Sequence, residues 1–172
     1  MKKHVIYIFS WLTVLWIAKV FLFSLPYKFS GHPDTQHIFG TIGQWMQGVF
    51  GASVGEWFSS YGAIAVGLAE LSVSLLLFLP VILFINNKLS THESKISQSL
   101  IHSLGGLAAS GIMAGAVFFH LATPLGIEVL HQGKSDGGSL FYAAVSILVL
   151  GLIMAIANFS LVQEEQLARS NA

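Results

Sequence analysis

The sequence contains no cysteine and few charged residues, and both shortages restrict what the protein can be. Without cysteine there are no disulfides, no thiolate-ligated zinc sites, no iron–sulfur clusters and no thiol redox chemistry. Charged residues make up only 9% of the 172 residues, against roughly a quarter in soluble domains. A chain this apolar cannot cover a surface that faces water. The formal net charge of zero also gives no reason to expect nucleic-acid binding.

What the sequence has instead is long apolar runs, and hydrophobic residues make up 54% of it. Four runs reach the length of about 20 residues that a helix needs to cross the hydrocarbon core of a bilayer. They cover approximately residues 5–25, 61–85, 99–121 and 140–162. Backbone groups in lipid must be hydrogen-bonded within their own segment, which favours helices. The sequence therefore predicts an all-α fold: a polytopic membrane protein whose single domain, residues 1–172, is a bundle of four transmembrane helices.

Basic residues predict the orientation of these helices. One side carries Lys2, Lys3, Lys88, Lys95 and Arg169, and the other carries Lys28 and Lys134. The cytoplasmic segments of membrane proteins are enriched in Lys and Arg. Both termini are therefore expected in the cytoplasm, and the membrane is expected to be a bacterial inner membrane. The first apolar run is longer than a signal-peptide core and no small-residue cleavage site follows it, so it is expected to remain as a membrane anchor.

A shorter amphipathic segment, residues 35–50, follows the first span on the expected outer side. Its apolar residues recur at helical spacing, and they are Ile38, Phe39, Ile42, Trp45, Met46, Val49 and Phe50. Aromatic residues on such a face suit the interface between bilayer and water. The segment is therefore predicted to be an interfacial helix, a lid over the bundle, or both.

Glu70 lies deep in the second apolar run, where an ionised side chain is costly unless it faces other helices. Ala63, Gly67, Glu70 and Ser74 follow steps of four, three and four, so they form one face of small and polar residues. Lys19 has a similar predicted depth in the first span, and a Lys19–Glu70 pair would reduce the cost of both charges. The alternatives are a protonated Glu70 and a Lys19 that extends to the membrane surface.

Two histidines and an asparagine add further polar positions within the spans. His120, near the outer end of the third span, is expected to join Lys19 and Glu70 in an outer polar layer that binds a ligand or only connects helices. His102 and Asn158, near the inner ends of the third and fourth spans, are expected to pair as structural hydrogen-bonding groups. The apolar stretch between these two layers argues against a continuous polar path.

Metal and haem chemistry find little support in the sequence. Several histidines fall on the expected outer side, but a glutamate and a histidine at three-residue spacing occur there once, as Glu128 and His131 in a loop. Carboxylate di-iron bundles need that motif on two helices. His102 and His120 lie at opposite ends of one span, so they cannot ligate one haem together. Neither metal nor haem is therefore expected, and the chain has no nucleotide-binding glycine motif.

Three segments resemble the DoxX-like family of small four-span membrane proteins. They are "LPYKFSGHP" after the first span, "GLAELSVSLLLFLP" in the second and "GIMAGAVFFHLATPLG" at the end of the third. The resemblance covers nearly the whole chain and singles out Lys28 and Glu70 as the positions that carry over. One difference is Leu25, three residues before Lys28, where many relatives have a glycine.

The resemblance implies an accessory subunit of a membrane redox system without catalytic activity of its own. A quinone headgroup is one candidate ligand, and the candidate binding residues are the outer polar layer of Lys19, Glu70 and His120 together with Lys28. The alternatives are a non-enzymatic scaffold or assembly factor, and a small-molecule or proton pathway. The expected partners are the lipid bilayer and either membrane redox proteins or further copies of the chain.

Overall fold

A computed structural model describes residues 2–89 and 96–170 of the chain. The helices are α1 (Lys2–Phe29), α2 (Pro33–Phe50), α3 (Ala52–Leu89), α4 (Gln98–Ala122) and α5 (Ser139–Ser170), and the strands are β1 (Leu130–His131) and β2 (Lys134–Ser135). Helices α1, α3, α4 and α5 are long and apolar enough to cross a membrane. The prediction of an all-α membrane protein with four spans is therefore confirmed.

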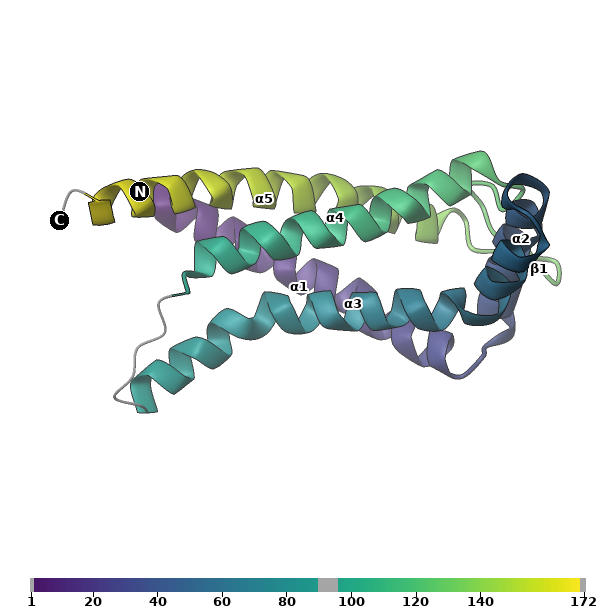
Figure 1. Cartoon of the computed structure of the whole chain (residues 1–172), viewed down its shortest axis with the longest axis horizontal. Helices are drawn as coiled ribbons and strands as arrows, with labels where there is room; N and C mark the ends of the chain where they lie inside the picture. Colours follow the sequence, from purple (N-terminus) through teal and green to yellow (C-terminus); the bar gives the residue numbers. More distant parts are fainter. Residues whose placement is uncertain (1, 90–95, 171–172) are drawn as a thin grey trace.

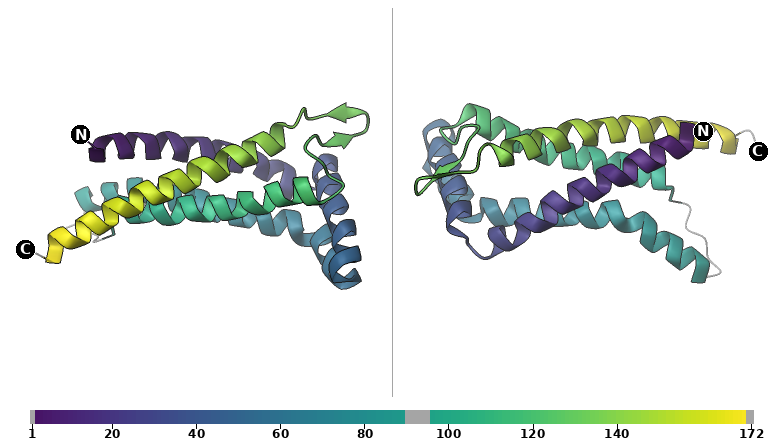
Figure 2. Two further views of the ribbon diagram at one scale, coloured as in Figure 1. Left: turned by 90° about the horizontal axis from the view of Figure 1, so that it is seen from above. Right: turned by 180° about the vertical axis from the view of Figure 1, so that it is seen from behind.

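The four long helices run along the long axis of the molecule, and α2 lies across one end of them (Figure 1). The start of α1 and the end of α5 lie at the opposite end, as the two further views also show (Figure 2). We call these the α2 end and the terminal end. The crossing position of α2 matches the predicted lid.

Helix α1 extends further than the apolar run that predicts it. It continues through Pro26 to Phe29. Proline lacks a backbone N–H, but within the last turn this forfeits a single helical hydrogen bond. The extra turn brings Lys28 into the helix and next to the bundle, whereas the predicted boundary at Leu25 left it in a loop.

The apolar core lies where α1, α3, α4 and α5 meet along the axis. Its buried residues are Val14, Ile17, Phe21, Val73, Leu77, Ala109, Met113, Ala144, Ile147 and Met154. Helices α4 and α5 are also joined by hydrogen bonds, because the hydroxyls of Ser103 and Ser110 donate to the carbonyls of Ala155 and Leu148 at 3.0 Å. Such bonds join helices where lipid offers no hydrophobic driving force for association. The core separates the buried polar residues of the α2 end from those of the terminal end.

A second, smaller apolar cluster lies under α2. Ile42 of α2 packs against Leu125 and Val129, which belong to the connection between α4 and α5. This connection carries a hairpin of β1 and β2, in which Leu130 pairs with Ser135 and His131 with Lys134. Its packing against α2 closes the α2 end of the bundle.

Candidate functional site

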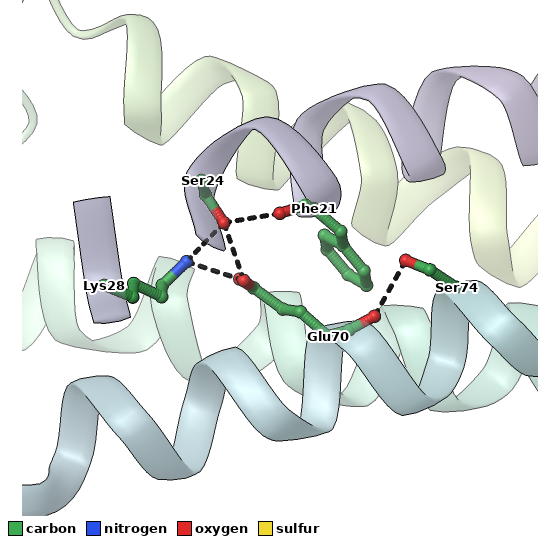
Figure 3. A network of polar contacts seen from close by, with 5 residues as sticks. All are labelled: Phe21, Ser24, Lys28, Glu70 and Ser74. Carbon is green, nitrogen blue, oxygen red and sulfur yellow. Dashed lines mark hydrogen bonds and ion pairs between the residues drawn. The ribbon is translucent and has the colours of Figure 1, made fainter. Parts of the chain in front are cut away.

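Glu70 is buried and forms an ion pair, but its partner is Lys28. The Lys28 Nζ lies 2.6 Å from Glu70 Oε2, and the two side chains are 14% and 4% exposed. Figure 3 shows the ammonium group of α1 reaching across to the carboxylate of α3. An intramembrane carboxylate is expected to face other helices, and this one does.

Ser24 completes the network from one turn before Lys28 on α1. Lys28 Nζ donates to the Ser24 hydroxyl at 2.8 Å, and that oxygen lies 2.8 Å from Glu70 Oε2 and 2.7 Å from the Phe21 carbonyl oxygen (Figure 3). A hydroxyl has one proton, so Ser24 donates to one of these two acceptors at a time. The Ser24 hydroxyl therefore accepts a hydrogen bond from the ammonium group and donates its own proton to either the Glu70 carboxylate or the Phe21 carbonyl.

Small residues on α3 make room for this contact. Gly67 lies one turn before Glu70, and a Cβ atom there would come within 2.7 Å of the Phe29 ring. Ser74, one turn after Glu70, donates to the Glu70 backbone carbonyl at 2.8 Å and leaves the carboxylate to Lys28 and Ser24. Gly67, Glu70 and Ser74 are all buried, as the predicted small and polar face requires.

The prediction that Lys19 is the partner of Glu70 was wrong. Lys19 is exposed on the outside of the bundle, and its Nζ lies 5.5 Å from the centre of the Trp16 ring. The reason is the direction in which each lysine side chain leaves the axis of α1. Nine residues separate Lys19 from Lys28, which is about two and a half helical turns, so the two lysines point in opposite directions. The prediction compared the depths of Lys19 and Glu70 in the membrane but not the side of α1 on which Lys19 lies.

His120 does not belong to this network either. It is buried, and its Nδ1 lies 2.6 Å from the Gly126 carbonyl oxygen, so that nitrogen carries the proton and donates. The ring also packs edge-on against Phe141. His120 thus fastens the start of the α4–α5 connection, and the expected layer of Lys19, Glu70 and His120 does not form.

The predicted pair of His102 and Asn158 does not form. Asn158 donates through Nδ2 to the Ser10 hydroxyl at 2.7 Å and to the Met154 carbonyl at 2.8 Å, while its Oδ1 has no partner. The His102 ring packs edge-on against Trp11, and neither ring nitrogen has a hydrogen bond. The prediction failed because α1 brings Ser10 and Trp11 to this level, and each contacts one member of the expected pair.

A polar cluster at the α2 end was not predicted as a unit. Asp34 at the start of α2 lies 2.6 Å from His131 Nδ1 in the hairpin, and the His131 ring stacks on His37 at 4.6 Å. The hydrogen bond from His131 lowers the pKa of the exposed Asp34 carboxyl. Asp34 and His131 border a pocket of about 430 Å³ together with His32 and Lys134. The sequence shows the histidines but not that the hairpin folds back onto α2.

Among residues 2–89 and 96–170, no group of three or more histidine and acidic side chains is arranged to hold a metal ion. The polar cluster at the α2 end joins α2 to the hairpin through the contact of Asp34 with His131 and the stacking of His131 on His37. Lys28, Glu70 and Ser24 form a network that contains a buried ion pair between two spans. They are the strongest candidates for chemistry within the membrane.

The Lys28–Glu70 pair has unused hydrogen-bonding capacity. An ammonium group has three N–H donors, and Lys28 uses two of them, for Ser24 and Glu70. The bonds to the Glu70 carboxylate all reach Oε2, so within the described part of the chain Oε1 accepts none. One donor and one acceptor thus remain on adjacent groups, which suits a small polar ligand that can both accept and donate a hydrogen bond.

Comparison with known proteins adds no assignment. No family model matches the chain, no curated protein matches it, and no solved structure matches it. A function must therefore be inferred from the geometry of the site and from the position of the site within the membrane bundle.

Proposed function

We propose that this chain is an accessory subunit of a membrane redox system and binds a quinone headgroup at Lys28 and Glu70. The observation that carries the proposal is the buried ion pair itself, with one side chain 14% and the other 4% exposed. A buried pair is poor evidence for a stabilising role, since apolar side chains often stabilise as well or better. An ionisable residue retained inside a membrane bundle is by default a candidate for function.

The chemistry of a quinone fits the capacity that the pair leaves unused. A quinone carbonyl accepts a hydrogen bond from the remaining N–H of Lys28, and a quinol hydroxyl donates to Glu70 Oε1. The ligand is neutral and amphipathic, so it approaches from the bilayer, where the partly exposed Lys28 side chain gives access. Neither side chain has to leave its partner for the ligand to bind.

The proposal includes membership of the DoxX-like family, on the segments that resemble it. The two positions that this resemblance singles out, Lys28 and Glu70, are the two residues that the structure pairs. It also places the chain in a bacterial inner membrane with both termini in the cytoplasm, because most basic residues lie at the terminal end. A reporter fused after Asn87 should give a cytoplasmic signal, and a periplasmic signal there would reverse the orientation.

The direct experiment is to measure quinone in protein that is gently purified from its membrane. We expect quinone to copurify with the wild type and to be lost from Glu70→Gln, which keeps the shape of the side chain but removes its charge. Ser72→Ala is the matched control, because Ser72 lies on α3 two residues away and is exposed. Quinone that is absent from the wild type, or equal in all three proteins, would contradict the proposal.

A non-enzymatic scaffold is the second candidate, and the exposed Lys19 favours it. A charged side chain on the outer face of a span is expected to meet a protein partner rather than lipid. The two functions are compatible, because Lys19 and Lys28 point to opposite sides of α1. A proton or small-molecule pathway has weaker support, since the packed apolar core interrupts the polar residues along the axis.

A further inference from the structure

Lys19 is a charged residue near the middle of a membrane span that faces away from the bundle. The span in α1 covers Lys3–Phe29, so Lys19 lies three residues from its midpoint, or about 4.5 Å along the axis. Its side chain is exposed, and its Nζ lies 5.5 Å from the centre of the Trp16 ring. Charged residues within spans almost always face the interior of the bundle or a water-filled cavity.

The position is costly if lipid surrounds it. From Lys19 to the end of the span at Phe29 is ten residues, or about 15 Å, which is about half the thickness of the hydrocarbon core. Lysines near helix ends reach the interface with a four-carbon stem, but this one starts near the middle. The contact with Trp16 offsets part of the cost, since a cation over an indole ring is attracted to it.

We propose that the outer face of α1 around Lys19 docks a transmembrane helix of another protein that carries a carboxylate at mid-membrane depth. An acidic side chain there would neutralise Lys19 within the interface. The exposed residues on this face are Ile8, Leu12, Leu15, Lys19 and Leu22. They follow steps of four, three, four and three, which is the spacing that one helix presents to another.

A second copy of the chain does not supply the required carboxylate. Of the acidic residues in the described spans, Glu70 is buried and already paired with Lys28. The others, Glu56, Glu164 and Glu165, lie toward the ends of their helices rather than at mid-depth. The complementary charge must therefore come from a different protein. The docking face also lies on the side of α1 opposite Lys28, so it is separate from the proposed quinone site.

The test uses synthetic transmembrane helices of leucine and alanine that carry a central Glu, Gln or Leu. Their association with the full chain is measured by energy transfer in lipid vesicles. We expect the Glu helix to bind about tenfold or more tightly than the Leu helix, as a polar contact between helices in lipid provides. Lys19→Met should remove this preference. Lys19→Glu should transfer the preference to a helix with a central Lys.

Lys88→Met is the matched control, because Lys88 also lies over an aromatic ring, 4.9 Å from the centre of Phe84, but near the end of α3. It should leave the preference for the Glu helix unchanged. Equal binding of all three helices, or equal binding by wild type and Lys19→Met, would show that lipid covers this face. Self-association of the full chain that depends on Lys19 would assign the face to a second copy, and it too would overturn the proposal.

Discussion

At the scale of single residues, the position of a buried charge along the sequence was easier to predict than its partner. Glu70 was predicted to face the bundle because small and polar residues surround it at helical spacing, and it does. The choice between Lys19 and Lys28 required the rotation of α1 about its axis and the point at which it ends. Both depend on tertiary packing, and Pro26 concealed the true end of the helix.

The ion pair predicts an asymmetric response to substitution. Lys28→Met leaves Glu70 buried and unpaired, which should destabilise the bundle by about 3–5 kcal/mol. Glu70→Leu should cost less, because the partly exposed Lys28 side chain lies in the last turn of α1 and can turn toward water. The double variant should recover much of the stability that Lys28→Met loses. The free energy of unfolding in a detergent titration measures all three variants.

The control for this cycle is Lys19→Met combined with Glu70→Leu. Lys19 faces outward, so its removal should recover none of the stability that Glu70→Leu loses. If Lys19→Met recovered the stability lost in Glu70→Leu and Lys28→Met did not, Lys19 would be the partner of Glu70. That result would refute the pairing seen in the structure.

At the scale of elements, the attachment of α2 to α3 depends on two glycines that face each other. A Cβ atom on Gly43 would lie 2.7 Å from the Gly55 carbonyl oxygen, and one on Gly55 would overlap the Gly43 carbonyl and the Gln47 backbone nitrogen. Gly51 joins the two helices with a φ of +94°, a conformation that other residues rarely adopt. The lid is therefore held by close backbone contact as well as by the apolar cluster under α2.

Gly55→Ala should loosen α2 from the bundle, because backbone atoms cannot yield to the added methyl group. We expect a loss of about 1–3 kcal/mol in the free energy of unfolding, typical of overpacking, with faster hydrogen exchange across α2. Gly48→Ala is the matched control, since nothing lies within 4 Å of a Cβ atom there. It should stabilise α2 by roughly 0.5–1 kcal/mol. Equal exchange in the two variants would show that the glycine contact does not hold the lid.

Asp136 holds the hairpin against the start of α5. Its carboxylate accepts hydrogen bonds from the backbone N–H groups of Val129, Gly138 and Leu140 at 2.7–3.0 Å. Partial burial raises the pKa of the Asp136 carboxyl, but these bonds outweigh it and keep the pKa below the ordinary value of 3.8. A carboxylate with a lowered pKa stabilises the fold fully above its ordinary value. That contribution is lost only as the pH falls through the lower value of the folded state.

Asp136→Asn should therefore weaken the hairpin at neutral pH, because an amide offers one acceptor oxygen where the carboxylate offers two. We expect hydrogen exchange at Val129 and Leu140 to become about fivefold faster, as the loss of ~1 kcal/mol of capping energy would produce. Glu128→Gln should change it little, since Glu128 accepts one exposed hydrogen bond, from Ser135. Unchanged exchange in Asp136→Asn would contradict this account.

At the scale of the whole molecule, the four spans could be predicted because lipid leaves the backbone few choices. Length and hydropathy located all four helices, and amphipathic spacing located α2. The contacts between these elements could not be predicted from length, hydropathy or spacing. The hairpin that packs on α2 and the contact of Asp34 with His131 depend on the packed bundle. So do the contacts of Ser10 with Asn158 and of Trp11 with His102.

The pair of Lys28 and Glu70 fixes the end of α1 against α3 and is the centre of the proposed function. The most direct test is the distance between the lysine Nζ and the glutamate Cδ in bilayers, measured by solid-state NMR with ¹⁵N and ¹³C labels. Lys3 also lies 3.0 Å from Glu165, so the spectra are compared between variants. We predict that the short-distance signal loses the part due to Lys28 in Lys28→Met and is unchanged in Lys19→Met. A signal that survives Lys28→Met in full would contradict the pair.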